Sequence, residues 1–497
     1  MAQLKGPFPP GDYPLVVVGS GPGGVQMSYC LKRLGIAHAV ISSDERPGGM
    51  FQRFPKLERL ISWSKPHAPV DRETSAYLRY DWNSLLADEP QHQAAAADFM
   101  DGSSYFPARA EMERSIAAFV ERAGVTIRYG CTWEATAAQN GGFSLATSEG
   151  EYRCKIPLFA IGMAEPWKPP VDGLDAVPHY AETKKPQEYT DKRVFIVGKR
   201  NSGFELADGL LPWARQIILA SPSPPVISVV NRTVAAARAR YMQPYEDHIL
   251  GGGNFVLDAA IERISRSNGT YRVAVRGTTV PGDFTLEVDE VIAATGFEVP
   301  MVDLRTLGVA TFMQDRVPAL TPYWESITVP GIYFAGAVSQ GAPGLNKYGI
   351  PSTSAAVLGF RFNAQVLARH LAEKYFGARV ERPKLGADDV VPFLLGEATR
   401  SPELWNQQAY LARVVSFSPE LGIRDEGIVP LAHFVDAEGP DSIAMTLESN
   451  PAADIYPTAY LRIRGRVEEH QFPPAPLHDF EMAEHRKQLK SLLTELL

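Results

Sequence analysis

Cysteine is scarce in this chain of 497 residues. Its three cysteines, Cys30, Cys131 and Cys154, are far apart in the sequence, and none belongs to a Cys-x-x-Cys pair. This argues against a disulfide scaffold and against a dithiol redox centre, and it fits the reducing conditions of the cytoplasm. No Ser/His/Asp, Cys/His or metal-ligand spacing stands out either, so we expect no metal site.

Long apolar runs and long runs of one charge are also missing. Residues 1–10 lack the basic and apolar stretches of a secretion signal, and no apolar run approaches the length of a membrane span. The formal net charge is -8, and basic residues are not interleaved with aromatic ones. We therefore expect a cytoplasmic protein without nucleic-acid or membrane partners.

The chain is too long for one simple core, so we expect two or three domains. A glycine motif opens the first of them. The apolar run Leu15–Val18 predicts a buried parallel strand, and Gly19, Gly21 and Gly24 follow it at the spacing Gly-x-Gly-x-x-Gly. Gly19 permits a tight turn, Gly21 lets the backbone approach a pyrophosphate, and Gly24 lets the next helix pack closely. The motif predicts a dinucleotide site; a glycine-rich turn without a ligand is the alternative.

An acidic residue at the end of the second strand usually holds the adenosine ribose of a dinucleotide. Here the predicted strand Ala37–Ile41 is followed by Ser42 at that place. We expect Asp44 or Glu45 to hold the ribose instead, and a solvated charged turn is the alternative. The paired glycines Gly48-Gly49 follow and again permit close backbone approach.

A second strand, glycine turn and helix begin at Arg193. The apolar run Val194–Val197 leads to Gly198 and Gly203, but Arg200 stands where the middle glycine belongs. Arg200 makes close approach of a pyrophosphate harder, yet it places a guanidinium where it could pair with phosphate. The chain therefore binds two dinucleotides, or one of the two sites is vestigial.

The strand after this second turn, Gln216–Ala220, ends in Ser221 rather than in an acid. An acid there would accept a hydrogen bond from the ribose 2′-hydroxyl and would repel a 2′-phosphate. Its absence, with Arg232, Arg238 and Arg240 following in the sequence, favours NADPH over NADH. A solvated surface is the alternative for these arginines.

Two later strands also end in glycine turns, at Gly296 and at Gly336. The first resembles the turn at Gly162, so the chain is expected to leave the first domain once and return. The other expected elements are helices over 25–34, 111–123, 351–375, 393–412 and 479–496, and strands over 126–129, 143–146, 151–161 and 458–463.

In order and spacing, these motifs resemble the class B flavoprotein monooxygenases, which are flavoproteins with two dinucleotide-binding domains. The resemblance covers roughly residues 12–376. Besides the first glycine motif, it rests on Gly48-Gly49, Phe106-Pro107, Asn201-Ser202-Gly203 and Ala294–Phe297. It implies an α/β fold with two Rossmann-like domains and a C-terminal α+β extension.

The resemblance implies that FAD binds the first unit and NADPH the second. It places the FAD-binding domain at 1–165 and 287–378, the NADPH-binding domain at 166–286, and a cap or oligomerisation region at 379–497. The residues that we expect at the two cofactors are Gly19, Gly21, Gly23, Gly24, Asp44, Glu45, Gly48, Gly49, Met50, Phe51, Gly162, Gly198, Arg200, Asn201, Ser202, Gly203, Ser221, Gly296 and Gly336.

The reaction implied by the resemblance is oxygenation of a small molecule by O2, most often at nitrogen or sulfur, through a flavin C4a-(hydro)peroxide. Many members carry an Asn near the flavin, three residues before a Lys. Ser62 precedes Lys65 in this way here, which makes these two the candidate catalytic residues. His179 follows Gly173 at a longer spacing than in the family, and a structural linker histidine is its alternative. Whether the chain forms a homodimer stays open.

Two other functions compete with oxygenation. The first is an NAD(P)H-dependent flavin reductase or dehydrogenase that passes electrons to a protein or a quinone. Ala337 counts slightly against it, because such reductases usually have Asp at that place. The second is a flavoprotein that senses or scaffolds with a dead second nucleotide site, and only Arg200 supports it.

Overall fold

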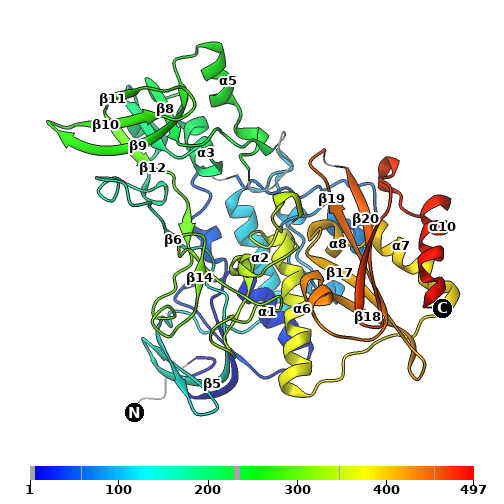
Figure 1. The fold of residues 1–497 in the computed structure, drawn as a ribbon. Helices are drawn as coiled ribbons and strands as arrows, with labels where there is room; N and C mark the ends of the chain where they lie inside the picture. The colour runs from blue at the N-terminus through cyan, green and yellow to red at the C-terminus, as the bar shows by residue number, and fades with distance from the viewer. Residues whose placement is uncertain (1–5, 58, 229–235, 346, 453, 497) are drawn as a thin grey trace. The chain divides into compact units, whose positions relative to one another are not determined.

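The computed structural model describes residues 6–57, 59–228, 236–345, 347–452 and 454–496. The chain folds into two compact units (Figure 1). Unit 1 comprises Met1–Gln52, Ser62–Met163 and Val299–Leu497, and unit 2 comprises Arg53–Ile61 and Ala164–Glu298.

Unit 1 contains a mixed sheet of six strands. These are β1 (Asp12–Val18), β2 (Ala39–Ile41), β3 (Trp133–Gln139), β4 (Gly142–Thr147), β5 (Gly150–Phe159) and β16 (Tyr333–Phe334). Their order is β2-β1-β5-β4-β3, and β16 also pairs with β5. Strand β1 runs parallel to both β2 and β5, while β3, β4 and β5 form an antiparallel meander. Parallel strands on both sides of β1 give the Rossmann arrangement that the sequence predicts.

Three long helices accompany this sheet: α1 (Pro22–Arg33), α2 (Arg109–Ala123) and α6 (Val357–Phe376). Helix α1 follows the glycine turn directly and packs against α6. Lys32 and Arg33 lie in its last turn, where positive charge stabilises the helix dipole. Helix α6 ends at Gly377, whose left-handed conformation closes the helix.

Unit 2 contains a second mixed sheet. Its strands are β7 (Arg193–Val197), β8 (Gln216–Ser221), β9 (Phe255–Ser267), β10 (Thr270–Gly277), β11 (Asp283–Val288) and β12 (Glu290–Ala293), in the order β11-β10-β9-β8-β7-β12. The helices among its described residues are α3 (Asn201–Leu210) and α5 (Gln243–Leu250). Strand β7 lies between parallel β8 and β12, as β1 lies between β2 and β5. Strand β12 therefore completes this sheet, and the chain returns to unit 1 at Val299 rather than at 287.

Two short strand pairs complete the part of the chain before residue 336. They are β6 (Glu165–Pro166) with β13 (Phe297–Glu298) in unit 2, and β14 (Thr311–Phe312) with β15 (Val317–Pro318) in unit 1. Among the described residues, no helix combines the length and the apolar character that crossing a membrane requires.

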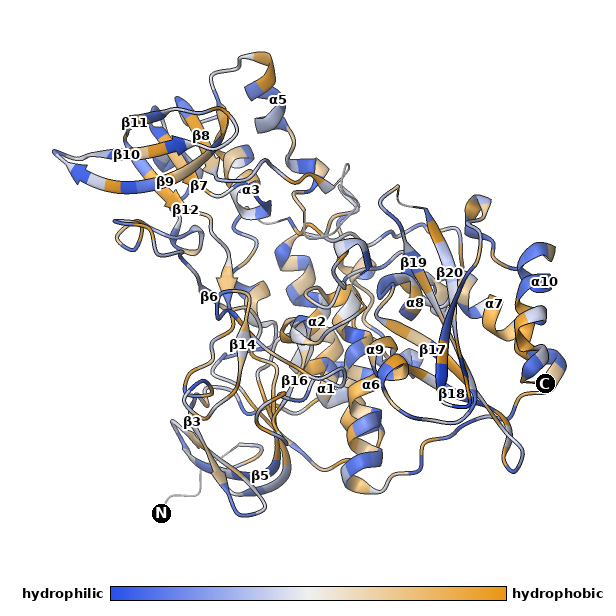
Figure 2. Cartoon of the chain, in the orientation of Figure 1, coloured by the Kyte–Doolittle hydropathy of each residue, from blue (hydrophilic) through white to orange (hydrophobic). Residues whose placement is uncertain are grey.

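The C-terminal region belongs to unit 1 and contains an antiparallel sheet of order β18-β17-β19-β20-β21. The elements are α7 (Val390–Arg400), α8 (Pro402–Asn406), β17 (Leu411–Ser418), β18 (Gly422–Pro430), α9 (Leu431–Asp436), β19 (Ser442–Ser449), β20 (Ile455–Ile463), β21 (Arg466–Gln471) and α10 (Ala483–Leu492). Apolar residues of α7, β17 and β19 share a core that includes Leu394, Val415 and Met445. Figure 2 shows the hydrophobic stretches of α7 and β17 in orange.

The predicted fold class, two Rossmann-like units with a C-terminal α+β extension, is confirmed, but three predicted elements are wrong in part. The helix over 393–412 breaks because Pro402 opens a separate helix and Ala409 has a positive φ. The strand over 126–129 is reduced to one bridge at Arg128. Helix α6 begins at Val357 rather than at 351, because the preceding segment makes side-chain contacts that are described below.

Candidate dinucleotide sites

The turn after β1 requires glycine for its fold at two positions. Gly19 has a φ of +115°, and a Cβ there would lie 2.5 Å from the Ala160 carbonyl oxygen. A Cβ on Gly24 would lie 2.0 Å from the Gly19 oxygen. The Gly19 N–H donates to the oxygen of Ile41 on β2, 2.8 Å away. These contacts hold the turn closely against the sheet and against α1.

Gly21 differs from these neighbours because the protein itself leaves room for a side chain there. It caps α1 with a φ of -67°, which any residue adopts. A Cβ would touch only the Gly49 Cα, at the ordinary contact distance of 3.7 Å. The first turn of α1 carries no acidic side chain and Gly21 provides no side-chain cap, so its N–H groups suit an anion. A pyrophosphate therefore fits where the side chain at 21 would project.

Three glycine turns meet at this helix terminus through their backbones. A Cβ on Gly49 would lie 2.8 Å from the Gly21 Cα, and one on Gly23 would lie 2.3 Å from the Gly336 Cα. The Gly48 N–H donates to the Ser20 oxygen over 3.1 Å. The structure thus brings together the predicted turns at 19–24, 48–49 and 336. Two further predicted residues also approach each other, because the Met50 Sδ lies 4.0 Å from a Cβ built on Gly162, and Phe51 is half-buried next to Met50.

Asp44 reaches the first glycine turn, although it lies beyond the end of β2. Its Oδ2 accepts a hydrogen bond of 2.8 Å from the Ser20 hydroxyl. The Ser42 hydroxyl, at the place usually taken by the acid, donates to Ser20 over 2.9 Å. Glu45 is exposed. Of the two predicted ribose ligands, Asp44 is the one that contacts the turn, and its role stays a prediction.

The turn after β7 repeats the first turn in unit 2. Gly198 has a φ of +124°, and a Cβ there would lie 2.4 Å from the Ala294 oxygen. A Cβ on Gly203 would lie 2.3 Å from the Gly198 oxygen. The Gly198 N–H donates to Ala220 on β8 over 2.8 Å, as Gly19 donates to Ile41. The two turns therefore share one backbone construction, in which the outer glycines are fixed by packing.

Arg200 occupies the middle position of the second turn without backbone strain. It caps α3 with a φ of -115°, and its side chain is exposed. Half-buried Asn201 and Ser202 follow in the first turn of α3. The Asn201 side chain accepts from the Arg238 N–H over 3.0 Å and donates to the Ala236 oxygen over 3.2 Å. Asn201 thus fastens the segment at 236–238 to the N-terminus of α3, where Arg200 is the capping residue.

Lys199 forms a buried ion pair that the sequence did not indicate. Its side chain is buried, donates to the Leu257 oxygen over 2.7 Å and forms an ion pair with Asp258. Asp258 lies opposite Ser221 in the pairing of β9 with β8. Burial would raise the pKa of Asp258, but the bond from Lys199 holds it below its ordinary value, and burial lowers the pKa of Lys199. An acid therefore lies beside the end of β8, with its charge neutralised.

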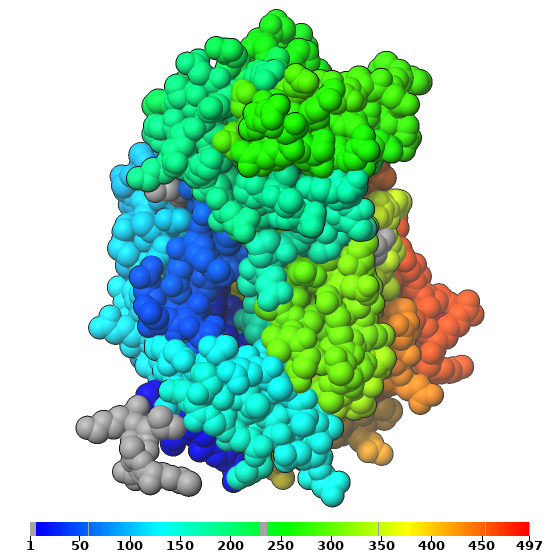
Figure 3. All heavy atoms as spheres, turned by 90° about the vertical axis from the view of Figure 1, so that its left-hand side faces the viewer, coloured from blue at the N-terminus to red at the C-terminus, as the bar shows by residue number. Residues whose placement is uncertain are grey.

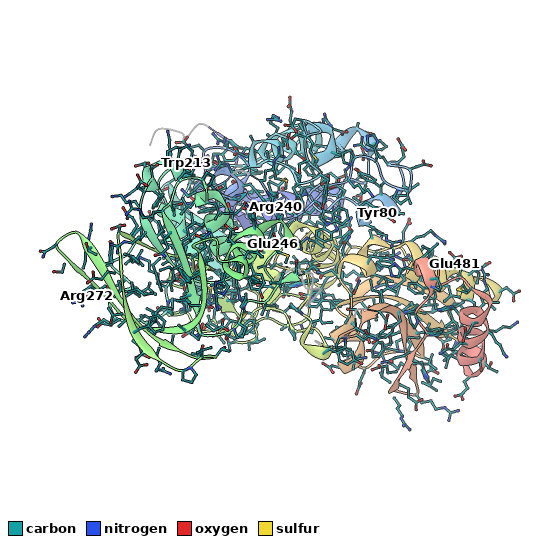
Figure 4. The ribbon with its side chains drawn as sticks, turned by 90° about the horizontal axis from the view of Figure 1, so that it is seen from above. Tyr80, Trp213, Arg240, Glu246, Arg272 and Glu481 are labelled. Carbon is teal, nitrogen blue, oxygen red and sulfur yellow. The ribbon has the colours of Figure 1, made fainter. Side chains whose placement is uncertain are left out.

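The arginines that suggested NADPH have different surroundings. Arg232 lies outside the described residues. Arg240, which is labelled in Figure 4, donates to the Leu60 oxygen over 2.8 Å, and its guanidinium lies 5.0 Å from the centre of the Tyr241 ring. These contacts fasten the segment before Ser62 to the rest of unit 2.

The two candidate catalytic residues have different surroundings, and their role stays a prediction. The Ser62 hydroxyl donates to the side chain of buried Asn83, which in turn donates to the Ser64 hydroxyl over 3.0 Å. The Lys65 side chain is exposed, and its backbone N–H donates to Tyr80 over 2.8 Å. In Figure 3 the segment that carries Lys65 lies at the surface, in blue. Asn83 is the polar neighbour of Ser62 that the sequence did not indicate.

His179 acts as a structural residue of unit 2. Its Nδ1 accepts from the Ala181 N–H over 3.1 Å, so its Nε2 carries the proton and donates to the Gly296 oxygen over 2.9 Å. Burial lowers the pKa of His179, which keeps the ring neutral. The predicted residue Gly296, with a φ of +94°, is thus held from the linker that precedes β7. These contacts favour the linker alternative for His179.

Comparison with known proteins gives a family match over most of the chain. The pattern described as pyridine nucleotide-disulphide oxidoreductase matches residues 16–336, from β1 to the Gly336 turn. The mouse protein named FAD-dependent oxidoreductase domain-containing protein 2 is 27% identical over 399 residues, which are 73% of this chain and 58% of that protein. The chain thus spans little more than half the length of this relative.

Solved structures share the fold at low identity. Bacillithiol disulfide reductase Bdr from Staphylococcus aureus has a TM-score of 0.56 at 16% identity, with 73% of this chain and 99% of that chain covered. The flavin-containing monooxygenase from Stenotrophomonas maltophilia has a TM-score of 0.55 at 18% identity, with coverage of 73% and 98%. These likenesses concern the fold.

Proposed function

Because the chain belongs to the pyridine nucleotide-disulphide oxidoreductase family, we propose that it is an FAD-dependent oxidoreductase that takes its electrons from NADPH. One observation carries this proposal: the same glycine turn is built twice, after β1 and after β7. Each turn presents a helix N-terminus at the carboxyl end of a parallel strand, which is where open α/β sheets bind dinucleotides.

The residues around the first turn fit FAD. The protein fills no space at Gly21, so the first-turn N–H groups of α1 would hold the pyrophosphate, with Gly49 close by. Asp44 would accept hydrogen bonds from the ribose hydroxyls. When bound, FAD supplies the two-electron chemistry that side chains lack, while the protein binds and orients it.

The residues around the second turn support NADPH. The exposed guanidinium of Arg200 would pair with a phosphate at the end of α3. The charge of Asp258 at the end of β8 is already neutralised by Lys199, which leaves less repulsion for a 2′-phosphate. A direct test is anaerobic reduction of the bound flavin by NADPH and by NADH. A preference for NADH would contradict this assignment.

For the reaction itself, we propose oxygenation of a small molecule at nitrogen or sulfur, in line with the motif resemblance. The cysteines support a reaction without a dithiol. Cys30, Cys131 and Cys154 are all buried, and burial raises the pKa of Cys30 and of Cys154 to about 12. Buried thiols with such pKa values form no reactive thiolate at neutral pH. The alternative is a reductase that passes electrons to a protein or a quinone.

Stopped-flow absorbance separates these two reactions. The protein is reduced with NADPH without oxygen and then mixed with oxygenated buffer. Oxygenation predicts a transient spectrum distinct from oxidised and from reduced flavin, and product formation from an amine or sulfide. Immediate reoxidation without a transient, together with rapid reduction of an added quinone, would favour the reductase.

A further inference from the structure

The segment 336–356, which connects β16 to α6, lies at the first dinucleotide site but has little regular structure. It contains only two short 3-10 turns, η8 (Gly336–Gly341) and η9 (Lys347–Gly349), among its described residues. Gly336 packs on Gly23 through its backbone. A shift of this segment would therefore move one wall of the helix terminus to which we assign the FAD pyrophosphate.

Gln407, from the C-terminal region, fastens the end of this segment. The side chain is completely buried. Its Oε1 accepts from the backbone N–H of Thr353 over 3.1 Å. The Thr353 hydroxyl lies 3.0 Å from the same oxygen but donates to the Asn406 carbonyl oxygen. Its Nε2 donates to the Ser354 hydroxyl over 2.9 Å and to the Asn363 Oδ1 over 2.7 Å. Both amide protons and the amide oxygen of Gln407 are therefore engaged, with partners just before α6 and within it.

The network continues from Gln407 to η8. The Asn363 amide donates to the Ser339 hydroxyl over 3.0 Å and to the Ser354 hydroxyl over 2.9 Å. Ser339 lies in the same 3-10 turn as Gly336. Gln407 is thus connected to the 3-10 turn that contains Gly336 through the Asn363 amide and the Ser339 hydroxyl. All three side chains are buried.

Tyr410 and two glutamates fasten the same segment at other points. The Tyr410 hydroxyl lies 3.4 Å from the carbonyl oxygens of Ser339 and of Ala342, which share its single proton. Its ring packs on Gly344, where a Cβ would lie 2.7 Å from the Tyr410 Cδ2. Lys347 forms ion pairs with Glu448 at 3.0 Å and with Glu469 at 2.6 Å.

We propose that the C-terminal region acts as a clamp that holds the segment 336–356 in its FAD-binding position, with Gln407 as the main positioning residue. This inference rests on the proposed FAD site. It assigns a role to a region that the sequence suggested as a cap or oligomerisation element. The region would set the affinity and the electronic environment of the flavin without contacting a substrate.

The test compares Gln407→Glu with Gln408→Glu. Both changes are isosteric and neighbouring, but the Gln408 side chain donates, among the described residues, to the Trp405 oxygen within the C-terminal region, over 3.3 Å. A glutamate at 407 loses the two donors that Ser354 and Asn363 require. We expect FAD to dissociate about tenfold more readily from Gln407→Glu and its midpoint potential to shift, while Gln408→Glu behaves as the wild type.

Lowering the pH supplies a readout that general loosening would not give. A protonated glutamate donates one hydrogen bond, so the loss of FAD affinity in Gln407→Glu should shrink as the pH falls, while Gln408→Glu should match the wild type at every pH. Tyr410→Phe keeps the ring on Gly344 and removes one hydroxyl. It provides a milder variant with a smaller shift in the same direction if Gln407→Glu fails to fold.

Three outcomes would overturn the inference. Wild-type FAD affinity and potential in both Gln407→Glu and Tyr410→Phe would show that the contacts do not reach the flavin. Equal losses in Gln407→Glu and Gln408→Glu would indicate general loosening of the C-terminal region. A wild-type protein that binds no FAD would instead refute the proposed function, and with it the assignment of Gln407.

Discussion

At the scale of single residues, the fold and the proposed cofactor place separate demands on the first glycine motif. Gly24 is required by the fold, because a Cβ would collide with the Gly19 oxygen at 2.0 Å. Gly21 has an ordinary φ and free space beside it. Its replacement therefore separates the loss of a ligand from the loss of the fold.

Gly21→Ala should weaken FAD binding by about tenfold or more, because the methyl group takes the place assigned to the pyrophosphate. The free energy of unfolding of the protein without flavin should change by less than about 0.5 kcal/mol. Flavin titration and urea unfolding measure the two quantities. The control Gly24→Ala should destabilise the fold itself by about 2 kcal/mol. Undiminished FAD binding by Gly21→Ala would place the pyrophosphate elsewhere.

Arg200→Ala should raise the KM for NADPH and for NADH about equally, by about tenfold, because the pyrophosphate is common to both. Steady-state kinetics at low ionic strength gives the comparison. Arg200→Lys keeps the charge but loses the paired hydrogen bonds of the guanidinium. Its KM values should therefore lie between those of the wild type and those of Arg200→Ala. A loss restricted to NADPH would mean that Arg200 contacts the 2′-phosphate.

The sequence predicts residues of the candidate sites that belong to a motif with a fixed spacing. It does not indicate residues that lie far away in the sequence and come close only in the fold. The glycines and Arg200 were found because backbone geometry dictates their order. Asp258 and Asn83 were not, since Asp258 meets Lys199 only through the pairing of β9 with β8. The sequence left Asp44 and Glu45 as equal candidates because Ser42 takes the usual place of the acid, and the Ser20 hydroxyl distinguishes Asp44 by bonding to it.

At the scale of elements, α6 fixes more of unit 1 than its sequence suggests. Arg361 is completely buried and donates to the carbonyl oxygens of Ser84, Leu78 and Asp81 over 2.7 to 2.9 Å. The irregular segment between η1 (Gly49–Gln52) and α2 is thus attached to a helix that follows much later in the chain. No periodicity in the sequence could indicate such a pairing.

Arg361→Met should destabilise the fold by about 3 kcal/mol, since three buried carbonyls lose their donor while the apolar stem is kept. Urea unfolding checks the value. Arg79→Met, which removes a less buried arginine that donates to Thr399, should cost less. An equal loss of unfolding free energy in both variants would mean that the three Arg361 contacts stabilise the fold no more than the single Arg79 bond does.

His370, also on α6, predicts a pH dependence of stability. It stacks on Tyr323 with ring centroids 4.0 Å apart, and burial lowers its pKa from 6.5 to about 4, with Lys374 acting in the same direction. The unfolded chain therefore binds the proton first, and stability should fall between pH 6.5 and 4. His370→Gln should flatten that part of the profile measured by urea unfolding. An unchanged slope in the variant would assign the effect to other groups.

Elements with one clear period were predicted best, as α2 illustrates. The C-terminal region was predicted poorly, because its strands alternate with short helices that share one core. Val415 and Leu447 are both completely buried, so β17 and β19 do not show the simple alternation of a half-exposed strand. When both faces of a strand are buried, apolar and polar residues no longer alternate along it, so the strand cannot be recognised by that alternation.

At the scale of the whole molecule, unit 1 is assembled from three separate stretches of the chain. A chain shortened after Gly377 should therefore fail to hold FAD, because Gln407 and Tyr410 leave with the removed part. Flavin absorbance of the purified fragment is the measurement. A soluble fragment with a full complement of FAD would show that residues 336–356 hold their position unaided.

The order of these stretches also has a consequence for the protein as it leaves the ribosome. Unit 2 is complete once Glu298 has emerged, but the wall formed by Gly336 and the residues that fasten it come afterwards. Domains fold as they emerge, beginning with the earlier ones. We therefore expect unit 2 to fold before the first glycine turn has its complete surroundings, because the Gly336 turn and the residues that fasten it emerge later.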